Sequence, residues 1–127
     1  MALLNRKPLV VITGASSGIG EACAKAFYNA GHPLLLIARR LDRLHALGMT
    51  QNVICAHVDV INGAQLKEAI DDAVQKYGPV DCLINNAGIM LLGKVHTQNP
   101  DEWQRMFDTN LMGVLNGIHA VLPSMGK

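Results

Sequence analysis

The stretch from Thr13 to Gly20 is the first part of the sequence whose residue types could do chemistry, because it combines glycines with two serines. Its glycines read G-x-x-x-G-x-G, which lets the chain turn tightly and lets a phosphate approach the backbone. Free N–H groups and the dipole at the start of a following helix would favour a pyrophosphate. Ser16 and Ser17 could add hydroxyl donors. No Gly-Lys-Ser/Thr follows, so the turn is not a P-loop. A tight turn that needs glycine for packing alone is the other interpretation.

A second candidate for ligand contact lies about 20 residues further on, where an acidic residue would bind the ribose 2′-hydroxyl of NAD. Ala38 stands at that position and is followed by Arg39 and Arg40. A guanidinium can bind a 2′-phosphate through two parallel hydrogen bonds, so the arginines favour NADP over NAD. Two alternatives stay open. The arginines could be solvated charges at a strand end, and Asp42 could be the acid, slightly displaced.

Segments of two kinds alternate along the chain and would position these residues. Continuously apolar runs are typical of strands buried on both faces of a parallel sheet, and they are Leu9–Thr13, Pro33–Ala38, Asn52–Val58 and Val80–Asn85. Segments with helical spacing of apolar residues follow them, and they are Gly18–Ala30, Leu41–Leu47, Asn62–Tyr77 and Pro100–Met125. The alternation predicts an α/β fold with a doubly wound parallel sheet, helices on both faces and strand order 3-2-1-4.

Length and composition favour one domain over residues 1–127, with a formal net charge of +1 and 50% apolar residues. Only 17% of residues are charged, which fits a chain with much buried surface. The near-neutral balance argues against nucleic acid as a partner, and no apolar run is long enough for a membrane span. The three cysteines are widely spaced and the histidines lack metal-ligand spacing, so we expect no metal site and a reducing, cytoplasmic location.

Asp59-Val60 follows the third apolar run, Asn85–Gly88 follows the fourth, and Asn110 lies inside the last helical segment. Together with Thr13–Gly20, these motifs resemble the short-chain dehydrogenase/reductase family. Thr13–Gly20 matches the family's TGxxxGxG turn, and Asp59-Val60 matches its acidic pair after the third strand. Asn85–Gly88 reads Asn-Asn-Ala-Gly, like the family's NNAG motif, and Asn110 matches its helix asparagine. The resemblance runs in order through the whole chain. It implies a Rossmann-type, three-layer fold that transfers hydride between a nicotinamide and a small carbonyl or alcohol substrate.

By this resemblance, Asp59 would accept a hydrogen bond from the adenine amino group, with the Val60 backbone beside it. Asn85 would tie strands together rather than touch the cofactor. Asn110 would be catalytic, holding a water in a proton relay; a helix kink or a surface amide is the alternative. Together with the glycine-rich turn and the two arginines described above, the predicted cofactor-binding residues are Gly14, Ser16, Ser17, Gly18, Ile19, Gly20, Arg39, Arg40, Asp59, Val60, Asn86, Ala87 and Gly88.

The family's catalytic serine and its Tyr-x-x-x-Lys motif have no counterpart in the sequence. Tyr28 and Tyr77 are followed four residues on by His32 and Asp81. We therefore expect residues 1–127 to be the NADP(H)-binding part of a longer reductase, truncated before the catalytic segment and unable to turn over substrate alone. A non-catalytic nucleotide-binding or interaction module on the same fold is the alternative.

The last helical segment, Pro100–Met125, has a broad apolar face. A chain of this length would leave part of that face uncovered and the outer edge of the fourth strand unpaired. In the family this helix commonly forms a subunit interface. We therefore expect a homo-oligomer formed through residues 100–125, or a longer native protein.

Overall fold

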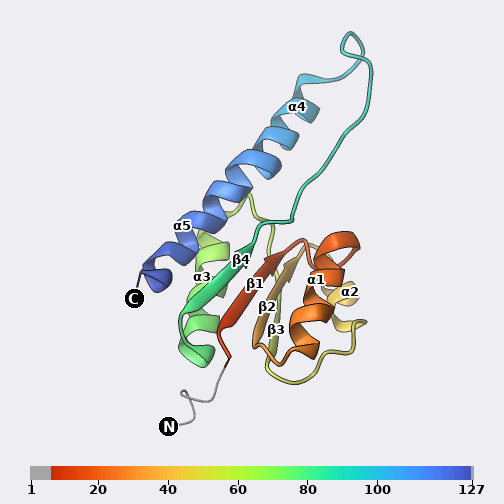
Figure 1. Ribbon diagram of the computed structural model, residues 1–127. Coiled ribbons are helices and arrows are strands. Elements are labelled where there is room, and N and C mark those ends of the chain that lie inside the picture. The colour runs from red at the N-terminus through yellow and green to blue at the C-terminus, as the bar shows by residue number, and fades with distance from the viewer. Residues whose placement is uncertain (1–6, 127) are drawn as a thin grey trace.

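Four parallel strands form the central sheet, and the structure, a computed structural model, describes residues 7–126 (Figure 1). The strands are β1 (Leu9–Thr13), β2 (Leu34–Ala38), β3 (Val53–His57) and β4 (Val80–Ile84), in the order β3-β2-β1-β4. The helices are α1 (Gly18–Asn29), α2 (Leu41–His45), α3 (Gly63–Tyr77), α4 (Pro100–Phe107) and α5 (Gly113–Met125). The predicted fold and strand order are confirmed, and the predicted bounds lie within two residues of those observed.

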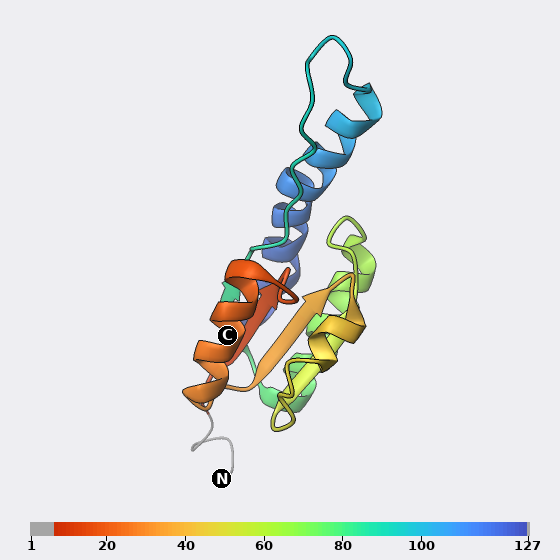
Figure 2. The same cartoon turned by 90° about the vertical axis from the view of Figure 1, so that its right-hand side faces the viewer.

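The two faces of the sheet are covered by different helices (Figures 1 and 2). Successive residues of a strand point to opposite faces. Leu9 and Val11 of β1 therefore pack on the side of α3 and α5, whereas Val10 and Ile12 pack on the side of α1 and α2. All four are fully or almost fully buried, and each such burial stabilises the fold by about 1.5–3 kcal/mol. The apolar run of β1 exists because both faces of this strand lie in the core.

The outer strands depart from the prediction that all four are buried on both faces. β1 and β2 are buried throughout, but β3 is half-buried with His57 exposed, and in β4 only Val80 is buried while Asp81 is exposed. The reason is position: β3 and β4 are the edges of the sheet, each paired on one side alone. A continuous apolar run marks a strand of a parallel sheet but does not tell a central strand from an edge.

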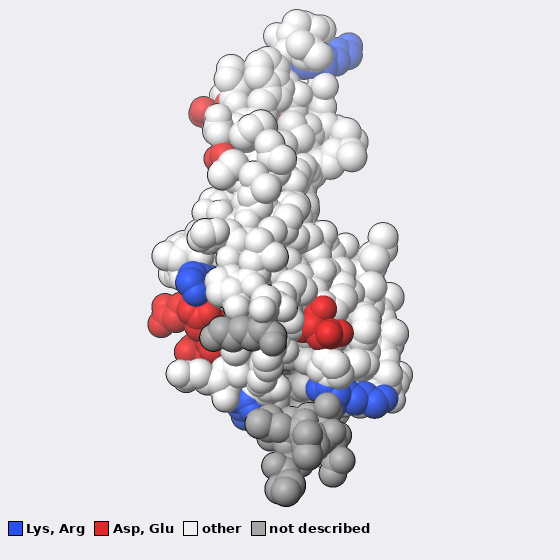
Figure 3. All heavy atoms as spheres, turned by 60° about the vertical axis from the view of Figure 1, so that its left-hand side comes forward, with Lys and Arg blue, Asp and Glu red and all other residues white. Residues whose placement is uncertain are grey.

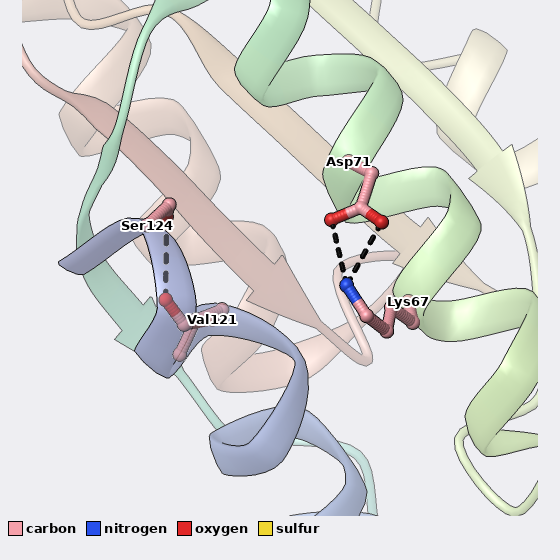
Figure 4. A network of polar contacts seen from close by, with 4 residues as sticks. All are labelled: Lys67, Asp71, Val121 and Ser124. Atoms are coloured by element: carbon pink, nitrogen blue, oxygen red, sulfur yellow. Dashed lines mark hydrogen bonds and ion pairs between the residues drawn. The ribbon is translucent and has the colours of Figure 1, made fainter. Parts of the chain in front are cut away.

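The helical segment predicted at Pro100–Met125 is observed as one path, with a π-helical stretch at Asp108–Met112 between α4 and α5. Its start is capped by Asn99, whose Oδ1 accepts a hydrogen bond from the Asp101 N–H at 2.8 Å. Its far end is fixed to the sheet: the Ser124 hydroxyl accepts from Val80 N at 3.1 Å and donates to the Val121 carbonyl at 3.2 Å (Figure 4). α4 and the loop before it extend away from the sheet (Figures 1 and 2).

Large apolar side chains lie on the outside of α4, the π-helical stretch and α5, and we call this surface the arm face. Each of its members is 39–56% exposed: Trp103, Phe107, Leu111, Leu115, Ile118 and Leu122. Figure 3 shows a stretch of this side of the molecule without Lys, Arg, Asp or Glu, between charged groups near the tip and at the base. Across residues 7–126, no helix is both long and apolar enough to cross a bilayer.

Candidate functional site

A cleft of about 250 Å³ opens at the carboxyl ends of the strands. The turns after all four strands contribute to it, which is where ligands bind in open α/β sheets. Its lining comprises Gly14, Ser16, Ser17, Ile37, Ala38, Arg39, Arg40, Arg43, Val58, Asp59, Val60, Asn86, Ala87, Gly88, Ile89 and Thr109. Most predicted cofactor-binding residues are therefore brought together, but Gly18, Ile19 and Gly20 lie outside the lining, as does Asn110, the predicted catalytic residue. Ile19 is 74% exposed on the first turn of α1.

The glycine-rich turn is tight at Gly14 and Gly20. Gly14 has a φ of +64°, a conformation that side chains disfavour. A Cβ on Gly20 would lie 2.1 Å from the Gly14 carbonyl oxygen, so α1 packs directly against the turn. Gly18 also has a positive φ, +58°, but nothing lies within 4 Å of a Cβ built there. Gly20 is thus needed for packing, whereas Gly18 is needed for backbone conformation beside open space.

The N-terminus of α1 differs from those of α3 and α4 in having no side-chain cap. Ser17 stands at the N-cap position, but its hydroxyl makes no capping hydrogen bond. In α3 and α4 the corresponding Asn62 and Asn99 side chains each accept a backbone N–H. The first N–H groups of a helix have no partner within the helix. At α1 they remain free for an anion, and Ser16 and Ser17 line the cleft beside them.

Thr13 joins the turn after β1 to the turn after β4. Its buried hydroxyl accepts hydrogen bonds from Asn86 N and Ala87 N, both at 3.0 Å. The Asn86 side chain adds a second link between the two turns, because its Nδ2 donates to the Gly14 carbonyl at 3.0 Å. Sequence reasoning did not name Thr13 as a site residue. The available signal was a hydroxyl residue ending an otherwise apolar strand, which needs a buried partner.

Asn85 makes a different contact from the one expected. Its Nδ2 donates to the Val114 carbonyl at 3.4 Å, and Gly117 leaves room for its side chain. Asn85 therefore ties β4 to α5 rather than strand to strand. The asparagine follows an edge strand, and a helix is the nearest element on that side.

Three arginines line the cleft after β2, and they differ in their partners. Arg40 donates to both carboxylate oxygens of Asp42 at 3.3 Å. These hydrogen bonds lower the pKa of Asp42 and raise that of Arg40. Within residues 7–126, Arg39 and Arg43 have no carboxylate partner. Arg43 was not predicted, although it lies three residues after Arg40, about one helical turn away.

The turn after β3 presents Asp59 and the Val60 backbone to the cleft. Asp59 Oδ1 accepts from the Ile61 N–H at 3.2 Å, which fixes the carboxylate in the turn. The Val60 side chain is in the core, packed against Gly113. Only the backbone of Val60 is therefore well placed to meet a ligand.

Asn110 lies in the π-helical stretch and forms a reciprocal pair with one backbone unit. Its Oδ1 accepts from Ile89 N at 2.8 Å and its Nδ2 donates to the Ile89 carbonyl at 2.7 Å. A π-helical turn often marks a functional position. These two hydrogen bonds hold the segment after Gly88 at the cleft wall. The catalytic role of Asn110 stays a prediction.

No cysteine or tyrosine lines the cleft. Burial raises the pKa of the Cys55 and Cys82 thiols, which disfavours the thiolate needed for nucleophilic chemistry. The Tyr28 hydroxyl accepts from Thr50 N at 3.3 Å, at the opposite end of α1 from the glycine-rich turn. No cluster of three His, Cys, Asp or Glu among the described residues could hold a metal ion.

The family model described as short chain dehydrogenase matches residues 8–127. The chain belongs to this family. It is 42% identical over 124 residues to the uncharacterized oxidoreductase Lin0452 of Listeria innocua, covering 94% of this chain and 50% of that protein. It is 38% identical to the NADP-dependent 3-hydroxy acid dehydrogenase YdfG of Salmonella typhi, covering 92% of this chain and 48% of that protein.

Solved structures of the short-chain dehydrogenase family share the fold. The 3-ketoacyl-(acyl-carrier-protein) reductase of Brucella melitensis, complexed with NADH, matches with a TM-score of 0.87 at 28% identity, over 94% of this chain and 50% of that one. This short-chain dehydrogenase chain spans about half the length of the curated relatives it matches.

Proposed function

We propose that this chain is the NADP(H)-binding part of a short-chain dehydrogenase/reductase acting on a small carbonyl or alcohol substrate in the cytoplasm. The observation that carries the choice of NADP is the cleft wall after β2, where Arg39, Arg40 and Arg43 line the cleft and Asp42 does not. A 2′-phosphate needs cationic donors, whereas a 2′-hydroxyl is usually bound by a carboxylate.

The residues present fit such a cofactor. When bound, the nicotinamide supplies or accepts the hydride. The uncapped start of α1, with Ser16 and Ser17, would hold the pyrophosphate. Arg39 and Arg43 would hold the 2′-phosphate, because Arg40 already binds Asp42. Asp59 and the Val60 backbone would receive the adenine, and the remaining cleft residues Asn86, Ala87 and Gly88 would line the nicotinamide-side ribose.

The named relatives do not decide between the two cofactors. YdfG is named as NADP-dependent, whereas the Brucella reductase is complexed with NADH. Calorimetry with NADPH and NADH on the wild-type chain and on Arg39→Ala tests the choice. Arg39→Ala should weaken NADPH binding by about tenfold or more and leave NADH binding unchanged.

Arg105→Ala is the matched control, because Arg105 is an exposed arginine on α4 outside the cleft. It should leave the affinity for both cofactors unchanged. Equal weakening of NADPH and NADH by Arg39→Ala would contradict the 2′-phosphate role of Arg39. Tighter binding of NADH than of NADPH by the wild type would contradict the choice of NADP.

We expect the 127-residue chain to bind the cofactor but not to catalyse the reaction. Neither Tyr28 nor Tyr77 is followed by lysine four residues on, and neither lines the cleft. A tyrosine general acid needs its pKa lowered from about 10 to work near neutral pH, and a nearby lysine does this in the family. The 127-residue chain should therefore bind NADPH without oxidising it in the presence of carbonyl compounds, and a measured turnover would contradict this expectation.

We also propose that the arm face pairs with a second copy of the chain. Its apolar members are 39–56% exposed along one helical path, and contiguous exposed apolar patches mark surfaces of protein–protein interaction. A closed dimer would remove these side chains from water on both copies.

A further inference from the structure

A side chain from α5 holds the turn that lines the cleft after β3. Asn116 Nδ2 donates a hydrogen bond to the Val60 carbonyl at 2.8 Å, across 56 positions of sequence. A carbonyl can only accept, so the amide nitrogen and not the amide oxygen must face Val60. Asn116 is half-buried on α5, one and a half turns after Asn110.

Two glycines allow α5 to approach the turn closely enough for this bond. A Cβ on Gly113 would lie 2.5 Å from Val60 Cγ2, so only a residue without a side chain fits there beside Val60. On the other side, a Cβ on Gly63 would lie 3.2 Å from Asn116 Oδ1. The carboxamide of Asn116 thus occupies a slot between the turn and the start of α3.

The turn itself is closed by short-range hydrogen bonds. The Ile61 N–H donates to Asp59 Oδ1 at 3.2 Å, and the Asn62 N–H donates to the Asp59 carbonyl at 2.9 Å. Asn62 then caps α3 by accepting the Gln65 N–H at 3.1 Å. These bonds set the local shape of the turn but do not fix it against the rest of the molecule.

Other polar contacts near the interface of α3 and α5 do not reach this turn. Lys67 Nζ binds both carboxylate oxygens of Asp71, at 3.1 and 2.9 Å, within α3 (Figure 4). Ser124 contacts Val80 and Val121, at the opposite end of α5. Among the contacts of residues 7–126 described here, the bond from Asn116 is the one that joins α5 to the turn with a directed donor.

We propose that Asn116 is a positioning residue for the adenine end of the cofactor cleft. By fixing the Val60 carbonyl, it orients the Val60 backbone and the neighbouring Asp59 carboxylate toward the cleft. The inference rests on the proposed binding of NADP(H). It adds that α5, whose outer side belongs to the arm face, determines affinity for the adenosine half of the cofactor and not for the nicotinamide half.

The test replaces the donor without changing the shape of the side chain. Asn116→Asp places a carboxylate oxygen where the amide nitrogen faces the Val60 carbonyl, and Asn116→Ala removes the side chain should the first variant fail to fold. Calorimetry uses two probes, 2′,5′-ADP for the adenosine half and reduced nicotinamide mononucleotide for the other half. Hydrogen exchange of the Ile61 and Asn62 amides reports the turn without any ligand.

The matched control is Ser124→Ala, which loosens the other end of α5 without touching the turn or the cleft. We expect Asn116→Asp to weaken 2′,5′-ADP binding by about five- to tenfold, with the mononucleotide unaffected, because one directed hydrogen bond is lost. Exchange of the Ile61 and Asn62 amides should accelerate in Asn116→Asp and not in Ser124→Ala.

Unchanged 2′,5′-ADP affinity, or equal weakening of both probes, would overturn the positioning role. Failure of the wild-type chain to bind either probe would instead overturn the proposed function. In that case the exchange measurement still decides whether Asn116 holds the turn: acceleration in Asn116→Asp alone supports the contact, and unchanged exchange refutes it.

Discussion

The side chains of the cleft and those of the arm face differ in how far the rest of the chain contacts and covers them. At the cleft, the buried Thr13 hydroxyl and the half-buried Asn86 amide have hydrogen-bond partners within the described residues, and the start of α1 has no side-chain cap. On the arm face, Phe107 and Leu122 are more than half exposed. The cleft is therefore shaped by contacts inside these residues, whereas the arm face stays uncovered within residues 7–126. Substitutions in the two regions should accordingly affect different measurements.

The largest expected effect is at Gly20. A methyl group at Gly20 would meet the Gly14 carbonyl oxygen at 2.1 Å, so Gly20→Ala must push α1 away from the turn. We expect a loss of about 3 kcal/mol in the free energy of unfolding by urea, together with loss of NADPH binding. Gly18→Ala is the control, since its methyl group meets nothing and only the strain of the positive φ remains, about 1–2 kcal/mol. Equal losses in the two variants would mean that packing at Gly20 is not the constraint.

Thr13→Val should have the next largest effect. The variant keeps the shape of the side chain but removes the acceptor of Ala87 N, whereas Asn86 N keeps a bond to the Ile84 carbonyl at 3.1 Å. An unsatisfied buried N–H costs about 1–3 kcal/mol, to be measured as a lower free energy of unfolding. Thr97→Val, on the loop before α4, is the control: it loses an exposed contact to the Lys94 carbonyl and should change the free energy of unfolding by less than about 0.5 kcal/mol.

On the arm face, polar substitutions should change association rather than stability. Leu115→Gln combined with Leu122→Gln removes two exposed apolar side chains from α5 and keeps good helix formers. The unfolding free energy should stay within about 0.5 kcal/mol of the wild type, while sedimentation equilibrium shifts toward monomer. Leu92→Gln, on the loop before α4, should leave the assembly unchanged. A wild-type chain that is monomeric at high concentration would refute the dimer.

The smallest effect concerns the ion pair beside the cleft. Hydrogen bonds from Arg40 hold the pKa of Asp42 below its usual 3.8. The folded state therefore gains stability from this pair above pH 3.8 and loses it as the pH falls through the lower folded-state pKa. An NMR titration of Asp42 should show a midpoint below 3.8 in the wild type and a return toward that value in Arg40→Ala. Because both groups are exposed, added salt should reduce the difference.

The sequence predicted the elements well because helical periodicity and apolar runs depend on local neighbours. It predicted most of the cleft because glycine turns and strand ends can be located by position alone. It missed Thr13, Arg43 and Asn116, whose roles depend on which element lies opposite. Asn116, for example, is an unremarkable asparagine on a helix until Gly63 and Gly113 bring the turn after β3 against it. Burial of the edge strands was predicted wrongly for the same reason, because a continuous apolar run does not show whether a strand has a neighbour on each side. The expectation that part of the apolar face of residues 100–125 stays uncovered agrees with the exposed arm face.

The strand order has a consequence for how the chain folds. The Thr13 hydroxyl accepts hydrogen bonds from the backbone N–H groups of Asn86 and Ala87, which lie 73 and 74 positions further along the sequence. Contacts across such separations form slowly, because a long loop must be closed before any bond is gained. The units from β1 to β3 pair with near neighbours, but the cleft exists only once β4 has docked on β1. We therefore expect the chain to complete its binding site only when β4 docks, after the nearer strand pairs have formed.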